Sequence, residues 1–201
     1  MKNSPRHNPF QGTGVALVTP FDAAGHVDYA GLRSLVTHCI AGGVDFLVAL
    51  GTTGESATLS SAEKAAVVDS ILEVNAGRLP VVLGVGGNDT REVVAALKSV
   101  PAGIDGILSV SPYYNKPSQE GIYQHYRQVA AATALPIILY NVPGRTSSNV
   151  TASTTLRIAQ DCHNVVAVKE ASGHMEQIMA ILDQAPEGFE VLSGDDNLTM
   201  P

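Results

Sequence analysis

One lysine stands out because of its place in the sequence. Lys169 follows directly on the apolar run 165–168, whereas the other four lysines lie in predicted helices, a loop or the N-terminal segment. Such a run predicts a buried strand, and burial disfavours the ammonium form of lysine and lowers its pKa. A neutral lysine amine attacks carbonyl carbons and forms Schiff bases. Lys169 is therefore a candidate nucleophile, and a salt bridge, for example to Glu170, is the alternative.

A tyrosine ends the preceding predicted strand. Tyr140 closes the apolar run 136–140, and a phenol at that point can exchange protons with a carbonyl as it becomes an iminium. The alternative is a packed ring whose hydroxyl makes one structural hydrogen bond.

Two loops carry groups suited to carboxylates. Thr52 and Thr53 lie between Gly51 and Gly54, where hydroxyls and exposed backbone N–H groups are available to an anion. Arg145 lies in a Pro-Gly loop, and a fixed guanidinium binds a carboxylate through two parallel hydrogen bonds. Ordinary loop chemistry and a solvated surface arginine are the alternatives.

The elements that must position these residues follow a repeating pattern. Short apolar runs recur about 30 residues apart, the length of one strand, one helix and their connections. Helical apolar spacing fills the intervals, and Ser60 with Glu63 forms a capping-box pattern before one helix. Seven strands are predicted, at residues 14–19, 44–50, 80–85, 106–110, 136–140, 165–168 and 189–192.

Strands this uniformly apolar must be covered on both faces, as parallel strands are. Two α/β architectures fit: a doubly wound open sheet and a (β/α)8 barrel. The glycine-rich segment 84–89 lacks the third glycine of a dinucleotide fingerprint and no phosphate-binding P-loop motif occurs, so the TIM barrel is favoured. We expect residues 1–201 to form a single barrel domain that lacks strand eight.

Composition excludes several classes of protein. The 201 residues carry a net charge of −7, and 45 % are hydrophobic, so the chain is a folded one without the basic clusters that nucleic acid requires. No apolar run reaches the roughly 18 residues of a membrane span, and no signal peptide is evident. The two cysteines and six histidines show no metal-ligand spacing. A cytoplasmic protein without membrane, nucleic-acid or metal partners is expected.

Five motifs occur in an order and at a spacing that resemble a known family. They are GTTGES at 51–56, PYYNKP at 112–117, YNVPGRT at 140–146, VKEASG at 168–173 and GDD at 194–196. The chain resembles the dihydrodipicolinate synthase (4-hydroxy-tetrahydrodipicolinate synthase) family of pyruvate-dependent class I aldolases, whose fold is a (β/α)8 barrel. The resemblance covers essentially all of residues 12–198, and it implies that the chain lacks the family's C-terminal helical region.

The resemblance implies a catalytic set. Lys169 would form the Schiff base with pyruvate and Tyr140 would transfer protons, connected through Thr53 to Tyr114 in a hydroxyl relay. Family members pair so that the tyrosine matching Tyr114 enters the neighbouring subunit's site. A homodimer or a homotetramer is therefore expected.

The resemblance also implies how substrates bind. Thr52 and Thr53 would receive the pyruvate carboxylate, Arg145 would bind the carboxylate of L-aspartate 4-semialdehyde, and Gly194 completes the substrate-binding set. The enamine would attack the aldehyde, and cyclisation onto the substrate amine would release the lysine. No metal or organic cofactor is implied, because the iminium itself is the electron sink.

Two other functions stay open at this point. N-acetylneuraminate lyases and 2-keto-3-deoxy sugar-acid aldolases share the lysine and the tyrosine, although they typically lack the NVPGRT arginine and the paired tyrosines present here. The other alternative is an inactive, truncated chain whose barrel cannot close, with unpaired edges on the first and last strands. Residues 60–64 lack the histidine pair of lysine-inhibited members, so the resemblance does not extend to feedback inhibition by lysine.

Overall fold

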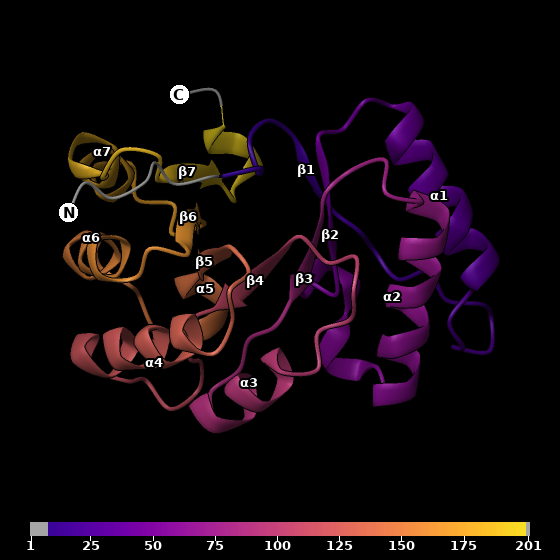
Figure 1. Ribbon diagram of the computed structural model, residues 1–201, viewed down its shortest axis with the longest axis horizontal. Helices are drawn as coiled ribbons and strands as arrows, with labels where there is room; N and C mark the ends of the chain where they lie inside the picture. Colours follow the sequence, from indigo (N-terminus) through magenta and orange to yellow (C-terminus); the bar gives the residue numbers. More distant parts are fainter. Residues whose placement is uncertain (1–7, 200–201) are drawn as a thin grey trace. The chain divides into compact units, whose positions relative to one another are not determined.

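The computed structural model describes residues 8–199 and divides into two compact units. The N-terminal unit comprises Pro9–Gly84 and Pro101–Gly106, and the C-terminal unit comprises Val85–Val100 and residues 107–199. The seven predicted strands are all present, and helices alternate with them along the chain (Figure 1). The alternation inferred from apolar runs is confirmed.

The N-terminal unit contains three parallel strands in chain order: β1 (Gly14–Ala16), β2 (Phe46–Ala49) and β3 (Val81–Gly84). Strand β1 is shorter than the apolar run that predicted it. Leu17 still donates to the carbonyl of Val48 at 3.0 Å, but Pro20 follows soon after and has no backbone N–H to donate. The four residues of β2 are all buried.

Two helices pack against each other in this unit, α1 (Tyr29–Ala41) and α2 (Ser61–Asn75). Each begins at a residue whose side chain accepts an orphan N–H: Asp28 accepts from Gly31, and Ser60 accepts from Glu63. The Glu63 carboxylate returns a bond to the Ser60 amide at 2.8 Å, which confirms the predicted capping box. Two short 3-10 turns, η1 (Thr52–Gly54) and η2 (Ser56–Thr58), connect β2 to α2.

Four parallel strands form the sheet of the C-terminal unit, again in chain order. Strand β6 continues two residues beyond the predicted run, so Lys169 lies within the strand and is not the first residue after it. Its last residues pair with Leu192 and Ser193, which supply the backbone partners that extend the strand. The strands are β4 (Gly106–Val110), β5 (Ile137–Asn141), β6 (Val165–Glu170) and β7 (Glu190–Ser193).

Helices α4, α6 and α7 follow one another along one side of this sheet (Figure 1). Their buried faces carry the apolar positions, for example Ile122 and Val129 on α4 and Ile158 on α6. The helices of the unit are α3 (Thr90–Leu97), α4 (Gln119–Ala131), α5 (Pro143–Thr146), α6 (Ala152–Asp161) and α7 (Met175–Gln184), with the 3-10 turn η3 (Asp196–Leu198) near the end.

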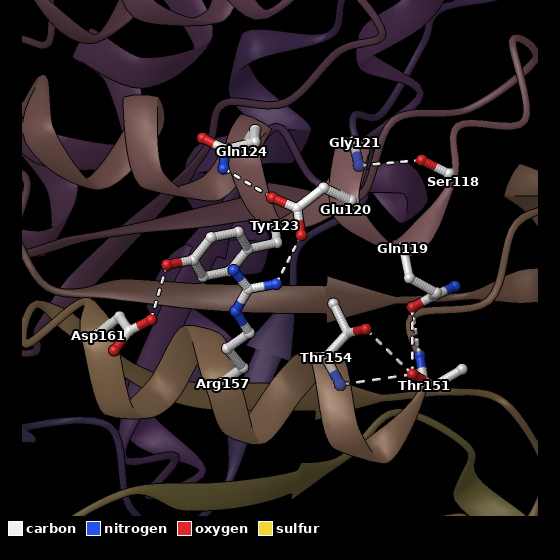
Figure 2. Close-up of polar contacts among 10 residues, drawn as sticks. All are labelled: Ser118, Gln119, Glu120, Gly121, Tyr123, Gln124, Thr151, Thr154, Arg157 and Asp161. Carbon is white, nitrogen blue, oxygen red and sulfur yellow. Dashed lines mark hydrogen bonds and ion pairs between the residues drawn. The ribbon is translucent and has the colours of Figure 1, made fainter.

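A group of polar contacts joins α4 to α6 (Figure 2). The guanidinium of Arg157 lies 3.5 Å from the ring centroid of Tyr123 and donates to Glu120 at 2.6 Å. The Tyr123 hydroxyl donates to Asp161, also at 2.6 Å. A cation over an aromatic face, together with these charge-assisted bonds, fixes the two helices side by side.

Among residues 8–199, no helix is both long enough and apolar enough to cross a bilayer. Within the same range, no cluster of three or more His, Cys, Asp or Glu side chains could hold a metal ion.

A histidine is buried in the C-terminal unit. His125 on α4 is 2 % exposed, is hydrogen-bonded through Nδ1 to the Thr90 hydroxyl at 2.8 Å, and meets the Tyr126 ring edge to face. Its Nε2 is buried without a partner among the described residues. Burial lowers the pKa of His125 to about 4, because the imidazolium would be poorly solvated.

This histidine makes stability depend on pH. The unfolded chain binds a proton on His125 below about pH 6.5 and the folded chain does so only near pH 4, so stability present above pH 6.5 is lost as pH falls towards 4, by about 3 kcal/mol in total. We expect His125→Asn, whose amide can still reach Thr90, to flatten the slope of unfolding free energy against pH in urea titrations. An unchanged slope would show that another group takes up the proton.

Candidate active site

Lys169 and Tyr140 are cross-strand neighbours in the C-terminal unit. The pairing of β5 with β6 sets Tyr140 opposite Lys169, and Lys169 Nζ lies 4.7 Å from the centroid of the Tyr140 ring. Paired residues of parallel strands project to the same face of the sheet. Tyr140 is 7 % exposed and Lys169 is half-buried, so the amine lies against an aromatic wall. The two residues that the sequence singled out on neighbouring strands are brought together.

A one-residue shift in the pairing produces this arrangement. Ile137 pairs with Val165, but Ile138 pairs with Ala167, so Val166 is an extra residue on β6. Without that shift, Lys169 would lie opposite Asn141 and would project from the sheet face opposite to that of Tyr140. Nothing in the apolar run signals the shift, and sequence reasoning missed it.

The pKa of Lys169 is lowered, chiefly because burial removes water from the ammonium. Nearby charges act in both directions: Asp196 and Asp195 favour the ammonium and raise the pKa, whereas Arg145 disfavours it and lowers the pKa. The Tyr140 ring, 4.7 Å from Nζ, also favours a cation over its face. The amine is thereby shifted towards its nucleophilic neutral form, as the sequence predicted.

Arg145 lies on a fixed backbone but has an exposed side chain. It belongs to the one-turn helix α5, which begins at Pro143. The buried Thr146 hydroxyl donates to the carbonyls of Val142 and Ser148, at 3.2 and 2.8 Å, and so anchors the turn. The guanidinium is close enough to act on the pKa of Lys169 and free to meet an anion from solvent.

Gly194 follows β7 where the backbone runs close to β6. Its N–H donates to the Glu170 carbonyl at 2.8 Å. A Cβ at this position would meet Ala171 Cβ at 2.7 Å and the Glu170 carbonyl oxygen at 3.1 Å. Only glycine permits this approach without a shift of the backbone, and it places Asp195 and Asp196 within electrostatic reach of Lys169.

Tyr114 lies in the loop after β4 and points into solvent, with 85 % of its surface exposed. Its φ of +70° is unusual for a bulky side chain, and Lys116 two residues on has a φ of +48°. Neighbouring Tyr113 is 40 % exposed. The loop therefore presents two tyrosines outward.

Thr52 and Thr53 belong to the N-terminal unit and are both exposed on the turn η1. The turn is anchored, because the buried Thr19 hydroxyl donates to the Gly54 carbonyl at 2.7 Å. Within the turn, the Gly54 N–H donates to the Gly51 carbonyl at 3.0 Å. The hydroxyls of Thr52 and Thr53 are carried on exposed residues of the predicted carboxylate-binding loop.

Glu170 does not pair with Lys169, as the alternation of side chains along a strand predicts. It is 2 % exposed and accepts hydrogen bonds from Asn141 and Gln177. This cluster could not be predicted from the sequence, because Asn141 lies 29 residues from Glu170 and none of the three residues is unusual in its own surroundings.

Comparison with known proteins identifies the family. The profile of the "Dihydrodipicolinate synthetase family" matches residues 9–201. The chain belongs to this family. It is 56 % identical over 192 residues to the 4-hydroxy-tetrahydrodipicolinate synthase of Parabacteroides distasonis, covering 95 % of this chain and 65 % of that protein. It is 53 % identical over 191 residues to the enzyme of the same name from Porphyromonas gingivalis, covering 94 % of this chain and 64 % of that protein.

A solved member of the dihydrodipicolinate synthetase family has the same fold. The crystal structure of the Thermotoga maritima dihydrodipicolinate synthase matches with a TM-score of 0.92 at 43 % identity, over 96 % of this chain and 66 % of that one. The predicted fold class is confirmed: the chain is α/β and supplies seven parallel strands of a (β/α)8 barrel. It spans slightly less than two thirds of the length of the two curated relatives.

The charges around Lys169 can be tested one at a time. Asp196→Asn removes a charge that favours the ammonium, so we expect the pKa of Lys169 to fall further. Arg145→Gln removes a charge that disfavours it, so the pKa should rise. Reductive methylation with isotope-enriched formaldehyde, followed by an NMR pH titration, measures both shifts. Asp183→Asn, an exposed carboxylate on α7, is the control, and shifts of the same sign in D196N and R145Q would contradict this electrostatic account.

Proposed function

We propose that this protein condenses pyruvate with L-aspartate 4-semialdehyde through a Schiff base, giving 4-hydroxy-tetrahydrodipicolinate, a step of lysine and diaminopimelate biosynthesis. The observation that carries the proposal is the half-buried Lys169 amine, with a lowered pKa, against the Tyr140 ring. The names of the curated relatives support the same reaction. We also propose that the protein carries out this biosynthetic step in the cytoplasm.

The first half of the reaction uses Lys169 and Tyr140. The neutral amine attacks the keto carbon of pyruvate, and the carbinolamine loses water to give an iminium. Loss of a proton from the methyl group then gives an enamine, with the iminium nitrogen as electron sink. We assign to the Tyr140 phenol the proton transfers at the carbinolamine, with Thr53 and Tyr114 as the hydroxyls that would carry the proton onward.

Binding of the carboxylates is assigned to the loops. Thr52 and Thr53 would receive the pyruvate carboxylate through their exposed hydroxyls, and Gly194 would allow the close backbone approach beside the amine. Arg145 would bind the carboxylate of the aldehyde substrate through its exposed guanidinium. The enamine carbon attacks the aldehyde, and the substrate amine then displaces the lysine nitrogen as the ring closes. No cofactor is needed for these steps.

Trapping of the Schiff base tests the assignment of the nucleophile. Pyruvate followed by borohydride should add to Lys169 the mass of one pyruvic acid less one oxygen atom, located by peptide mass spectrometry. Lys169→Ala should abolish the label, and Tyr140→Phe should slow labelling about 100-fold through loss of acid–base catalysis. Labelling of another lysine, or none in the unaltered chain, would contradict the proposal.

Acceptor specificity separates the related functions. Turnover of pyruvate with L-aspartate 4-semialdehyde, but not with sugar-derived aldehydes, supports the synthase. The reverse preference would favour an N-acetylneuraminate or 2-keto-3-deoxy sugar-acid aldolase. A trapped Schiff base without turnover of any aldehyde would favour the inactive chain.

We also propose that a second copy of the chain covers Tyr114, in a homodimer or a homotetramer. An aromatic side chain 85 % exposed at a φ of +70° has no support from its own chain that matches its size and strain. A partner surface over the Tyr113–Tyr114 loop would supply that support.

Sedimentation velocity over a range of concentrations tests the association. The unaltered chain should form dimers or larger assemblies, and Tyr114→Ala should shift the equilibrium to monomer. Tyr29→Ala, which removes another exposed aromatic from the start of α1, is the matched control and should sediment like the unaltered chain. A monomer at every concentration, or a Y114A variant that assembles normally, would refute the dimer.

A further inference from the structure

A buried carboxylate lies behind the Lys169–Tyr140 pair. Glu170 is 2 % exposed and, as the residue after Lys169, projects from the opposite face of the sheet. No ion pair within residues 8–199 includes it. A buried carboxylate is retained only where hydrogen bonds replace its lost hydration, so the groups around it are informative.

Three neutral groups donate to this carboxylate. Asn141 Nδ2 donates to both oxygens, at 3.0 Å to Oε1 and 3.1 Å to Oε2. Gln177 Nε2 on α7 donates to Oε2 at 3.0 Å, and the Ser172 N–H donates to Oε1 at 2.9 Å. Glu170 therefore holds together the last residue of β5, the loop after β6 and the helix that follows it.

A second layer of amides orients the donors. Asn141 Oδ1 accepts the Val150 N–H at 3.0 Å, and Asn149 Nδ2 donates to Gln177 Oε1 at 2.9 Å. Gln119 at the start of α4 donates through Nε2 to the Asn149 carbonyl at 2.7 Å, and its Oε1 accepts from Thr151, as Figure 2 shows. The orientation of each amide in this set is fixed by a neighbour.

The central bond of this cluster reports the strand register. Asn141 follows Tyr140, Glu170 follows Lys169, and the two pairs occupy successive rungs of the β5–β6 ladder. In the register that β5 and β6 have at Ile137 and Val165, Glu170 would lie opposite Val142, which has no side-chain donor. The Asn141–Glu170 bonds form only after the one-residue shift, and that shift sets Lys169 opposite Tyr140.

We propose that Glu170 is a positioning residue for the proposed Schiff-base chemistry. By accepting from Asn141, Gln177 and Ser172, it locks the shifted register and holds the Lys169 amine over the Tyr140 ring. It acts through Lys169 and Tyr140 and touches no substrate. The proposal rests on the proposed function for the reaction served, but the positioning itself is a property of the folded chain.

The effect is geometric and does not depend on the charge of Glu170 acting on Lys169. The charged groups that move the pKa of Lys169 are Asp196, Arg145 and Asp195, and Glu170 is not among them. Glu170→Gln keeps the size of the side chain but turns one acceptor into a donor that faces the Asn141 and Gln177 amides. The hydrogen bonds between Asn141 and residue 170 are thereby weakened without a change in side-chain volume.

The first measurement needs no pyruvate. In the isotope-methylated chain, the Lys169 methyl signal should be displaced by the ring current of Tyr140, since the amine lies 4.7 Å from the ring centroid. We expect this displacement to shrink in E170Q. The Lys169 signal is assigned by its loss in Lys169→Arg.

The control variant loosens the other end of the same strand. Asn164, directly before β6, donates through Nδ2 to the carbonyls of Ala130, Thr133 and Leu135 at 3.0, 2.9 and 3.4 Å. Asn164→Ala should lower stability without moving the Lys169 signal. A general loss of packing would instead affect N164A and E170Q alike.

The second measurement is the rate of borohydride trapping at saturating pyruvate. E170Q should trap about 10- to 100-fold more slowly, the cost of a small misplacement of reacting groups, with little change in the half-saturating pyruvate concentration. An E170Q signal and trapping rate equal to those of the unaltered chain would overturn the positioning role. Absence of trapping in the unaltered chain, with the ring-current result as expected, would overturn the proposed reaction alone.

Discussion

The pairing of β5 with β6 is the constraint on which the site depends. Two side chains with the right chemistry on adjacent strands are useful only if they project from the same face at the same level. A parallel ladder allows this in one register of every two, because a slip of one residue turns a strand's side chains to the other face. The extra residue at Val166 sets the register in which Tyr140 lies opposite Lys169. It also leaves the pairing irregular near the start of both strands.

The two faces of this ladder differ in how their ionisable side chains are surrounded. On the face of Lys169 and Tyr140, partial burial lowers the pKa of the amine, and the charges of Asp196 and Arg145 adjust that pKa in opposite directions. On the other face, Glu170 is fully buried and satisfied by amides. The side-chain hydrogen bonds of Glu170 therefore lie on the face opposite to Lys169 and Tyr140.

Much of this could be predicted from the sequence, and the remainder could not for physical reasons. Continuous apolar runs between helical patterns predicted all seven strands. Tyr140 and Lys169 could be selected because each lies at the end of such a run, where neighbouring residues indicate burial. The shift at Val166 left no signal, since every residue from 165 to 168 is apolar and either register buries them equally well. The cluster of Asn141, Asn149 and Gln177 around Glu170 was invisible, because common polar residues gain meaning only when the fold assembles them.

The donors around Glu170 are neutral amides, and this suits its place beside Lys169 in the chain. A buried arginine or lysine beside Glu170 would satisfy the carboxylate more strongly, but a second cation one rung from Lys169 would compete for any anion drawn to the amine. It would also bring a desolvation cost that a small unit has little burial energy to offset. Amide donors are neutral, directional and limited in number, so they fix where Glu170 lies while leaving the charge balance at Lys169 to Asp196, Asp195 and Arg145. A register held by directional bonds and a pKa set by burial and adjusted by nearby charges can then be changed separately by substitution, which a single ion pair serving both purposes would not allow.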